Sequence, residues 1–149
     1  MSLLRRLTGT AFIVIAGIAL ALVCSRAARA GDSAIPPKPV LYVTDNAGAL
    51  SSTVRDALEG ELQSYEKQTA HQVIVWIGQT TGDDALEDWT STVAQSWGVG
   101  HKGKDDGVVL FLFMQDRKVR IEVGYGLEGD LTDAAAAGII RNDITPYMR

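Results

Sequence analysis

Two uninterrupted apolar runs limit what this chain can fold into more than any other feature of its sequence. Val73–Ile77 and Val108–Met114 contain no polar residue and are rich in β-branched and aromatic side chains. Runs of this length between polar turns are typical of strands that are covered on both faces. They predict a layered α/β domain, with Val108–Met114 as its central strand.

The segments around these runs predict the covering helices and two weaker strands. Apolar residues recur at helical spacing in three places, and strict alternation marks a hairpin partner of the central strand. The order of elements indicates an α/β sandwich with a small mixed sheet. The predicted helices are Ser52–Gln68, a second from Gly82-Asp83-Asp84 to Trp97, and Ala134–Ile140 capped by Thr132 or Asp133; the further strands are Val40–Val43 and Val119–Val123.

The first 30 residues have the pattern of a secretory signal peptide. Arg5 and Arg6 precede an apolar run of 14 residues, Ala11–Cys24, and Ala28-Arg29-Ala30 matches a cleavage site. A membrane span needs roughly 20 apolar residues, so this run is short. We therefore expect a periplasmic or extracellular protein. The alternative is an uncleaved membrane anchor, because extension back to Leu7 gives an 18-residue stretch.

Cleavage after Ala30 leaves 119 residues, of which 31–39 form a proline-containing tether and 40–149 the folded domain. This mature chain has 10 basic and 18 acidic residues, a net charge of −8, and no cysteine. The missing cysteine excludes disulfides, a thiol nucleophile and cysteine-based zinc sites. The negative charge argues against nucleic acid and favours cations or basic partners.

Gly124–Gly129 spells G-x-G-x-x-G, the phosphate-binding fingerprint of dinucleotide-binding folds. The fingerprint should open a helix and be followed by an acidic residue on a second strand. Here it follows a hairpin strand, and Glu128 would place negative charge near a pyrophosphate. We therefore expect no nucleotide cofactor, and interpret the glycines as residues of a tight connection.

Acidic residues gather where the predicted loops leave the strands. Oxygen ligands on flexible loops outside the cytoplasm suit Ca²⁺ or Mg²⁺. The alternative is that they are turn formers, caps and solvated charges. His71 and His101 lack the spacing of a metalloenzyme, and no G-x-S-x-G or P-loop motif occurs. The acidic residues at these ends are Asp45, Asp105, Asp106, Glu128, Asp130 and Asp133.

Four segments together resemble the TPM domain, a family named after a plant thylakoid lumen protein, a photosystem II repair protein and a nematode receptor modulator. The resemblance spans about Val40 to Arg149, in order and with the expected spacings. The segments are Tyr42–Ser51, Trp97–Gly100, Lys104–Leu110 and Arg117–Gly129.

The resemblance implies a Rossmann-like α/β/α sandwich that is exported across a membrane. Family domains usually continue past the proline of their last helix, whereas this sequence stops three residues after Pro146, so the domain is expected to be shortened or incomplete at that end. The resemblance also implies a set of acidic positions at the loops, which we take as candidate metal ligands. These are Asp45, Asp105, Asp106, Glu128 and Asp133.

Members of the family are acid-phosphatase-like, calcium-binding, or active on membrane complexes. We favour a domain that binds or helps to assemble and maintain an envelope protein complex, with a divalent cation that orders its acidic loops, because no nucleophile or general acid stands out in the sequence. The alternative is a phosphatase in which Ca²⁺ or Mg²⁺ polarises a phosphomonoester and activates a water.

Overall fold

The computed structural model of the chain describes residues 35–148. The predicted signal peptide, 1–30, lies outside these residues, and so do positions 31–34 of the predicted tether. Within the described part, no helix has both the length and the apolar character that a membrane crossing requires.

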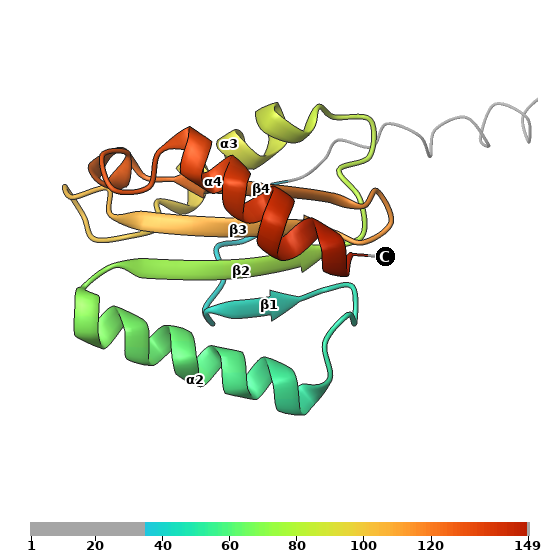
Figure 1. The fold of residues 1–149 in the computed structure, drawn as a ribbon, viewed down its shortest axis with the longest axis horizontal. Coiled ribbons are helices and arrows are strands. Elements are labelled where there is room, and N and C mark those ends of the chain that lie inside the picture. Colours follow the sequence, from blue (N-terminus) through green and yellow to red (C-terminus); the bar gives the residue numbers. More distant parts are fainter. Residues whose placement is uncertain (1–34, 149) are drawn as a thin grey trace, which may run out of the picture. The chain divides into compact units, whose positions relative to one another are not determined.

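A mixed sheet of four strands forms the middle layer of the domain (Figure 1). The spatial order is β1-β2-β3-β4, the first three strands are parallel, and β4 is antiparallel to β3. Helices cover both faces, so the predicted α/β fold with a mixed sheet is confirmed. The strands are β1 (Val43–Asp45), β2 (Gln72–Gly78), β3 (Gly107–Phe113) and β4 (Lys118–Val123).

The first strand starts later than its apolar composition predicted. Val40 is 98% exposed and Leu41 is 56% exposed, whereas Val43 is buried and pairs with Val75 of β2. The chain bends before Tyr42, whose amide donates to a helix side chain rather than to a strand. The prediction of Val40–Val43 was wrong because strand pairing, and not hydrophobicity, sets where an edge strand begins.

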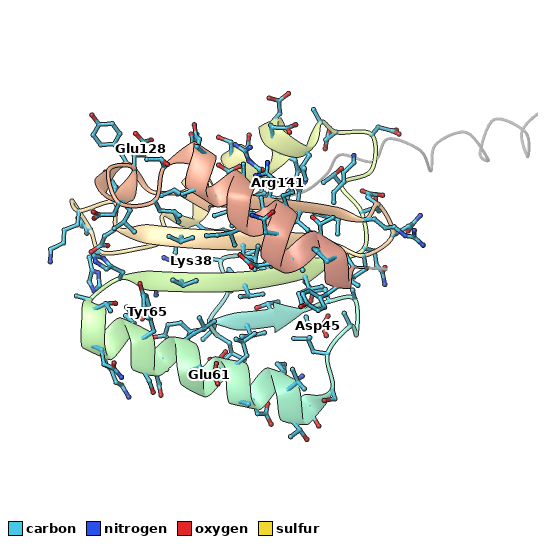
Figure 2. The ribbon with its side chains drawn as sticks, in the orientation of Figure 1. Lys38, Asp45, Glu61, Tyr65, Glu128 and Arg141 are labelled. Atoms are coloured by element: carbon cyan, nitrogen blue, oxygen red, sulfur yellow. The ribbon has the colours of Figure 1, made fainter. Side chains whose placement is uncertain are left out.

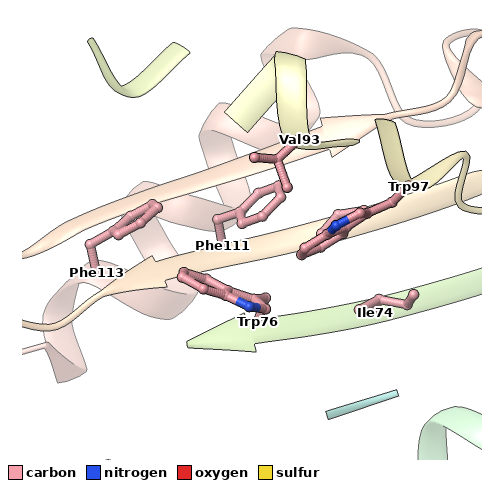
Figure 3. Packing of buried hydrophobic residues seen from close by; sticks show 7 residues of the cluster. Ile74, Trp76, Val93, Trp97, Phe111 and Phe113 are labelled. Atoms are coloured by element: carbon pink, nitrogen blue, oxygen red, sulfur yellow. The ribbon is translucent and has the colours of Figure 1, made fainter. Parts of the chain in front are cut away.

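Aromatic side chains fill the layer between the sheet and α3 (Leu86–Trp97), as Figure 3 shows. Phe111 on β3 has its ring centroid 5.6 Å from Trp97 and 6.0 Å from Trp76. Aromatic pairs at such distances add about 0.5–1.5 kcal/mol beyond the burial of their area. The buried cluster consists of Ile74, Trp76, Val93, Trp97, Val109, Phe111 and Phe113.

The opposite face of the sheet packs against α2 (Ser52–Thr69), which ends one residue beyond its predicted limit. Leu58 and Leu62 of this helix contact the apolar side chains of β1 and β2. The Ser51 hydroxyl accepts a hydrogen bond from the Val54 amide, and Ala70 ends the helix in a left-handed conformation.

The two other predicted helices have shifted limits. α3 begins at Leu86 rather than near Gly82, because the Thr81 hydroxyl donates to the Asp84 carbonyl and holds the preceding residues in a turn. α4 (Asp133–Ile139) is capped by the Thr132 hydroxyl, as predicted. A π-helical turn, Ile140–Ile144, and a 3-10 turn, Thr145–Tyr147, follow it.

The outer edge of β1 is closed by one side chain of α2. The Glu59 carboxylate accepts hydrogen bonds from the Val43 amide at 2.7 Å and from the Tyr42 amide at 3.1 Å. Unpaired backbone groups at a sheet edge invite strand addition from another chain. Glu59 therefore pairs the two backbone amides at the start of this edge and attaches β1 to α2.

We expect Glu59→Ala to lower the free energy of unfolding by about 2 kcal/mol, because two amides lose a charged acceptor. Urea unfolding measures the change. Glu61→Ala is the matched control, since Glu61 is an exposed residue of the same helix. Equal effects of the two substitutions would contradict this role of Glu59.

Candidate functional site

Two chain segments meet closely at the amino end of β3. The Gly124 amide donates to the Gly107 carbonyl at 2.8 Å, and the Gly126 amide donates to the Asp105 carbonyl at 3.0 Å. A Cβ atom on Gly124 would overlap the Asp105 carbonyl, and one on Gly126 would overlap the Lys104 carbonyl. The first two glycines of the G-x-G-x-x-G sequence thus allow backbone to lie against backbone.

A cleft of about 490 Å³ opens beside this junction, between α3, β4 and the turn that follows β4. We call it the acidic cleft, because three carboxylates line it and none of its lining residues is Lys, Arg or His. Tyr125 stands at the cleft and is 80% exposed. The lining residues are Ser91, Ala94, Gln95, Gly98, Val99, Asp105, Gly107, Val109, Glu122, Val123, Gly124, Tyr125 and Glu128.

Asp105 and Glu128 are the two predicted ligands that share this cleft, and both residues are exposed. Asp105 has a φ of 50°, a left-handed conformation that Asp and Asn adopt more readily than most residues. Asp133 does not line the cleft; it is the first residue of α4, where a negative charge is favourable beside the helix amino terminus.

Glu122 is a cleft residue that the sequence did not single out. Its Oε1 accepts hydrogen bonds from the buried Thr90 hydroxyl at 2.6 Å and from Arg120 Nε at 3.0 Å. Register explains its position, because Glu122 pairs with Val109, a residue of the cluster beneath α3. No local signal in the sequence points to Glu122, because tertiary packing buries Thr90 and the Thr90 hydroxyl also has an acceptor within α3, the Leu86 carbonyl at 2.9 Å.

Asp106 is occupied by internal hydrogen bonds. It is 6% exposed, and its Oδ1 accepts from the His101 amide at 2.6 Å, while His101 Nδ1 lies 3.2 Å from both carboxylate oxygens. Donation from the His101 amide outweighs burial and, with the nearby His101 ring, lowers the pKa of Asp106. This carboxylate organises the turn before β3.

His101 continues this network to α2. Its Nε2 lies 3.9 Å from Oε1 of Glu66, whose other oxygen accepts a hydrogen bond from the Tyr42 hydroxyl. The hydrogen bond to Glu66 is the largest cause that raises the pKa of Tyr42, followed by burial and the charges of Glu66 and Glu59. The network joins the turn before β3 to the far helix layer.

Asp45 lies at the other end of the sheet, as Figure 2 shows by comparison with Glu128. It pairs with Ile77, whereas Gly107 pairs with Gln72, and five residues of parallel strand separate those two levels by about 17 Å. Its carboxylate accepts hydrogen bonds from the Leu50 amide at 2.8 Å and the Ala47 amide at 3.1 Å.

The five predicted ligands are therefore distributed over separate places and do not form one metal centre. Asp105 and Glu128 line the acidic cleft, and Asp106 is hydrogen-bonded inside the turn before β3. Asp133 begins α4, and Asp45 lies at the opposite end of the sheet. Within residues 35–148, no three side chains of the types His, Cys, Asp and Glu are grouped so that they could hold one ion.

The fold and the cleft define a small α/β/α domain whose loops meet at the amino end of the central parallel strand. The TPM domain family model matches residues 43–149. This chain belongs to the TPM domain family.

Solved structures share this architecture. The N-terminal domain of a P. gingivalis protein is 38% identical, with a TM-score of 0.67 over 72% of this chain and 69% of that chain. The N-terminal domain of a Corynebacterium glutamicum protein is 19% identical, with a TM-score of 0.54 over 71% of this chain and 66% of that one. The BA42 protein of Bizionia argentinensis is 15% identical, with a TM-score of 0.56 over 65% and 66%. No curated protein matches the chain.

The close approach at the cleft leads to a steric prediction. We expect Gly126→Ala to lower the free energy of unfolding by about 1–3 kcal/mol, because the added methyl group overlaps the Lys104 carbonyl and forces the backbone to move. Gly129→Ala is the control, since no atom lies within 4 Å of its added Cβ. Thermal unfolding measures both, and equal melting temperatures would contradict the assigned role of Gly126.

The environment of Asp45 leads to a pH prediction. Partial burial raises its pKa, but donation by the Leu50, Ala49, Ala47 and Gly48 amides outweighs burial and lowers it below the usual 3.8. The charged form therefore stabilises the fold fully above pH 3.8, and this contribution is lost as the pH falls through the lowered folded-state pKa.

We expect Asp45→Asn to cost about 1–2 kcal/mol at pH 7 and progressively less as the pH falls below that window. Urea unfolding at a series of pH values measures the difference. Asp56→Asn, at an exposed position of α2, should show no such pH-dependent gap. A gap that stays constant down to pH 2 would refute the assignment.

Proposed function

We propose that this TPM domain is exported and binds a partner protein of the cell envelope through the acidic cleft. The observation that carries the proposal is the composition of the cleft, in which Asp105 and Glu128 are exposed and no lining residue is basic. Export rests on the signal-like sequence of residues 1–30, which lies outside the described part of the chain.

The chemistry of the cleft selects a basic side chain as ligand. A Lys or Arg side chain has an apolar stem and a charged end, so it can lie along Val99 while its charge meets the carboxylates. The exposed ring of Tyr125 offers a cation–π contact worth about 0.5–1 kcal/mol at such a site. The acidic balance of the mature chain also attracts a basic partner over longer range.

A divalent cation is the competing occupant of the same carboxylates. Asp105 and Glu128 would be its ligands, since oxygen donors on loops suit Ca²⁺ or Mg²⁺. A bound ion could order the two loops or serve a phosphomonoester hydrolase, as the sequence-based alternative requires. We favour the basic partner because Glu122 is already committed to Thr90 and Arg120, and the two remaining carboxylates are few for an ion that takes about 6–8 oxygen ligands.

Site-specific crosslinking tests the proposal in the whole protein in its own cells. A photoreactive phenylalanine replaces Tyr125 in one variant and Tyr147 in the other, since Tyr147 is 84% exposed and lies in the turn after α4. We expect defined envelope proteins at position 125 and none of these at position 147.

Charge variants then connect the captured protein to the cleft. Asp105→Asn combined with Glu128→Gln should lower its affinity at least tenfold, about 1.4 kcal/mol, and Asn tolerates the left-handed backbone at position 105. Asp130→Asn combined with Asp143→Asn is the matched control, because it removes the same two charges from exposed positions that do not line the cleft. Equal capture at both positions, or binding that ignores the double substitution, would remove the proposal.

Two further measurements test whether the cleft binds a divalent cation and whether the protein is a phosphatase. An ion at 100 times its Kd would add about 2.7 kcal/mol to stability, so millimolar Ca²⁺ would raise the melting temperature, and Asp105→Asn would abolish the rise. Hydrolysis of an aryl phosphate that needs the ion and disappears in Asp105→Asn would replace the binding proposal by the phosphatase. We expect neither result.

A further inference from the structure

Residues Ile35–Lys38, which we call the strap, are hydrogen-bonded to the carboxyl end of α3. The Trp97 indole Nε1 donates to the Pro36 carbonyl at 2.7 Å, and Lys38 Nζ donates to the Gly98 carbonyl at 3.0 Å. Both contacts join positions about sixty residues apart in the sequence. The strap precedes residues 43–149, the part that matches the TPM family model.

The other end of the strap contacts an earlier part of the same helix. Ile35 lines a hollow of about 230 Å³ together with Trp89, Thr92 and Val93 of α3. The strap therefore follows α3 from its middle to its last residue. Proline at positions 36, 37 and 39 favours the extended backbone that such a path needs, and it limits the freedom lost on docking.

Each of the two hydrogen bonds satisfies a group that the helix alone leaves unpaired. Trp97 is 4% exposed, so without the Pro36 carbonyl its indole N–H would be a buried donor lacking an acceptor. The Gly98 carbonyl belongs to the last turn, where carbonyls lack helical partners and a positive charge is favourable. The Lys38 ammonium supplies that charge.

The part of α3 held in this way is also a wall of the acidic cleft. Gly98 and Val99 line the cleft, and Gly98 ends the helix with a φ of 54°. Val99 also lies against Gly107, two residues after Asp105, since a Cβ atom on Gly107 would overlap the Val99 carbonyl. The position of the helix end therefore bears directly on the backbone that carries Asp105 into the cleft.

We propose that the strap is a conformational device that fixes the α3 wall of the acidic cleft, so that docking or release of Ile35–Lys38 controls ligand binding there. The control of ligand binding rests on the proposed binding function, whereas the holding of α3 by the strap does not.

Two variants of the full chain remove the two contacts separately. Lys38→Met keeps the length of the side chain without its charge, and Trp97→Phe keeps an aromatic ring without the indole donor. Lys67→Met, at an exposed position of α2, and Trp76→Phe, in the same aromatic layer but on β2, are the matched controls.

Two measurements are made on every variant. Amide hydrogen exchange at Gly98 and Val99 reports on the helix end, and the Kd for a tetralysine peptide reports on the cleft. We expect exchange to rise at least fivefold and the Kd to rise at least threefold in Lys38→Met and Trp97→Phe, with no change in the controls. If Trp97→Phe fails to fold, Lys38→Met alone decides, because it alters only an exposed residue.

The outcomes separate this inference from the proposed function. Unchanged amide exchange at Gly98 and Val99 would overturn the proposed role of the strap, whatever the Kd for the peptide. Faster exchange with an unchanged Kd would also overturn it, because the helix end would then not control the cleft. If the parent protein does not bind tetralysine but the exchange still rises, the proposed binding function fails while the holding of α3 by the strap is supported.

Discussion

Contact between the Trp97 and Phe111 rings is the interaction on which the remaining structure depends most directly. The centroids lie 5.6 Å apart, and the contact fixes the last turn of α3 over the central strand β3. The indole N–H donates to the Pro36 carbonyl, and the next residue, Gly98, lines the acidic cleft. One aromatic side chain thus connects the core, the amino-terminal segment and the candidate site.

Acidic residues in this domain divide according to whether a backbone amide reaches them. Asp45 and Asp106 accept amide hydrogen bonds that lower their pKa, and they organise turns at opposite ends of the sheet. Glu59 does the same for the edge strand. Asp105 and Glu128 stand exposed at the cleft. A carboxylate that already serves the fold is costly to recruit for a ligand, because its donors would lose their partner.

Much of the fold could be predicted, because its signals are local. The runs around Ile74 and Phe111 predicted the two interior strands, and the amphipathic pattern predicted α2 to within one residue. The limits that failed depend on distant partners: β1 begins where Val43 meets Val75, and the turn stabilised by Thr81 delays α3. The site was harder to predict, because the alternating pattern of β4 indicates that Glu122 faces solvent, and only its register with Val109 places it beneath α3.

The sequence by itself determined the layers, the identity of the family and the negative charge, since these depend on composition, periodicity and motif spacing along the chain. Only the tertiary structure decided which carboxylates stand together. Because β1 and β3 run parallel, the carboxyl end of β1 and the amino end of β3 lie at opposite ends of the sheet, so Asp45 and Asp106 cannot meet. The reversal of β4 brings Glu128 to Asp105 across the glycine junction, because strand direction and register act between residues that no local pattern links.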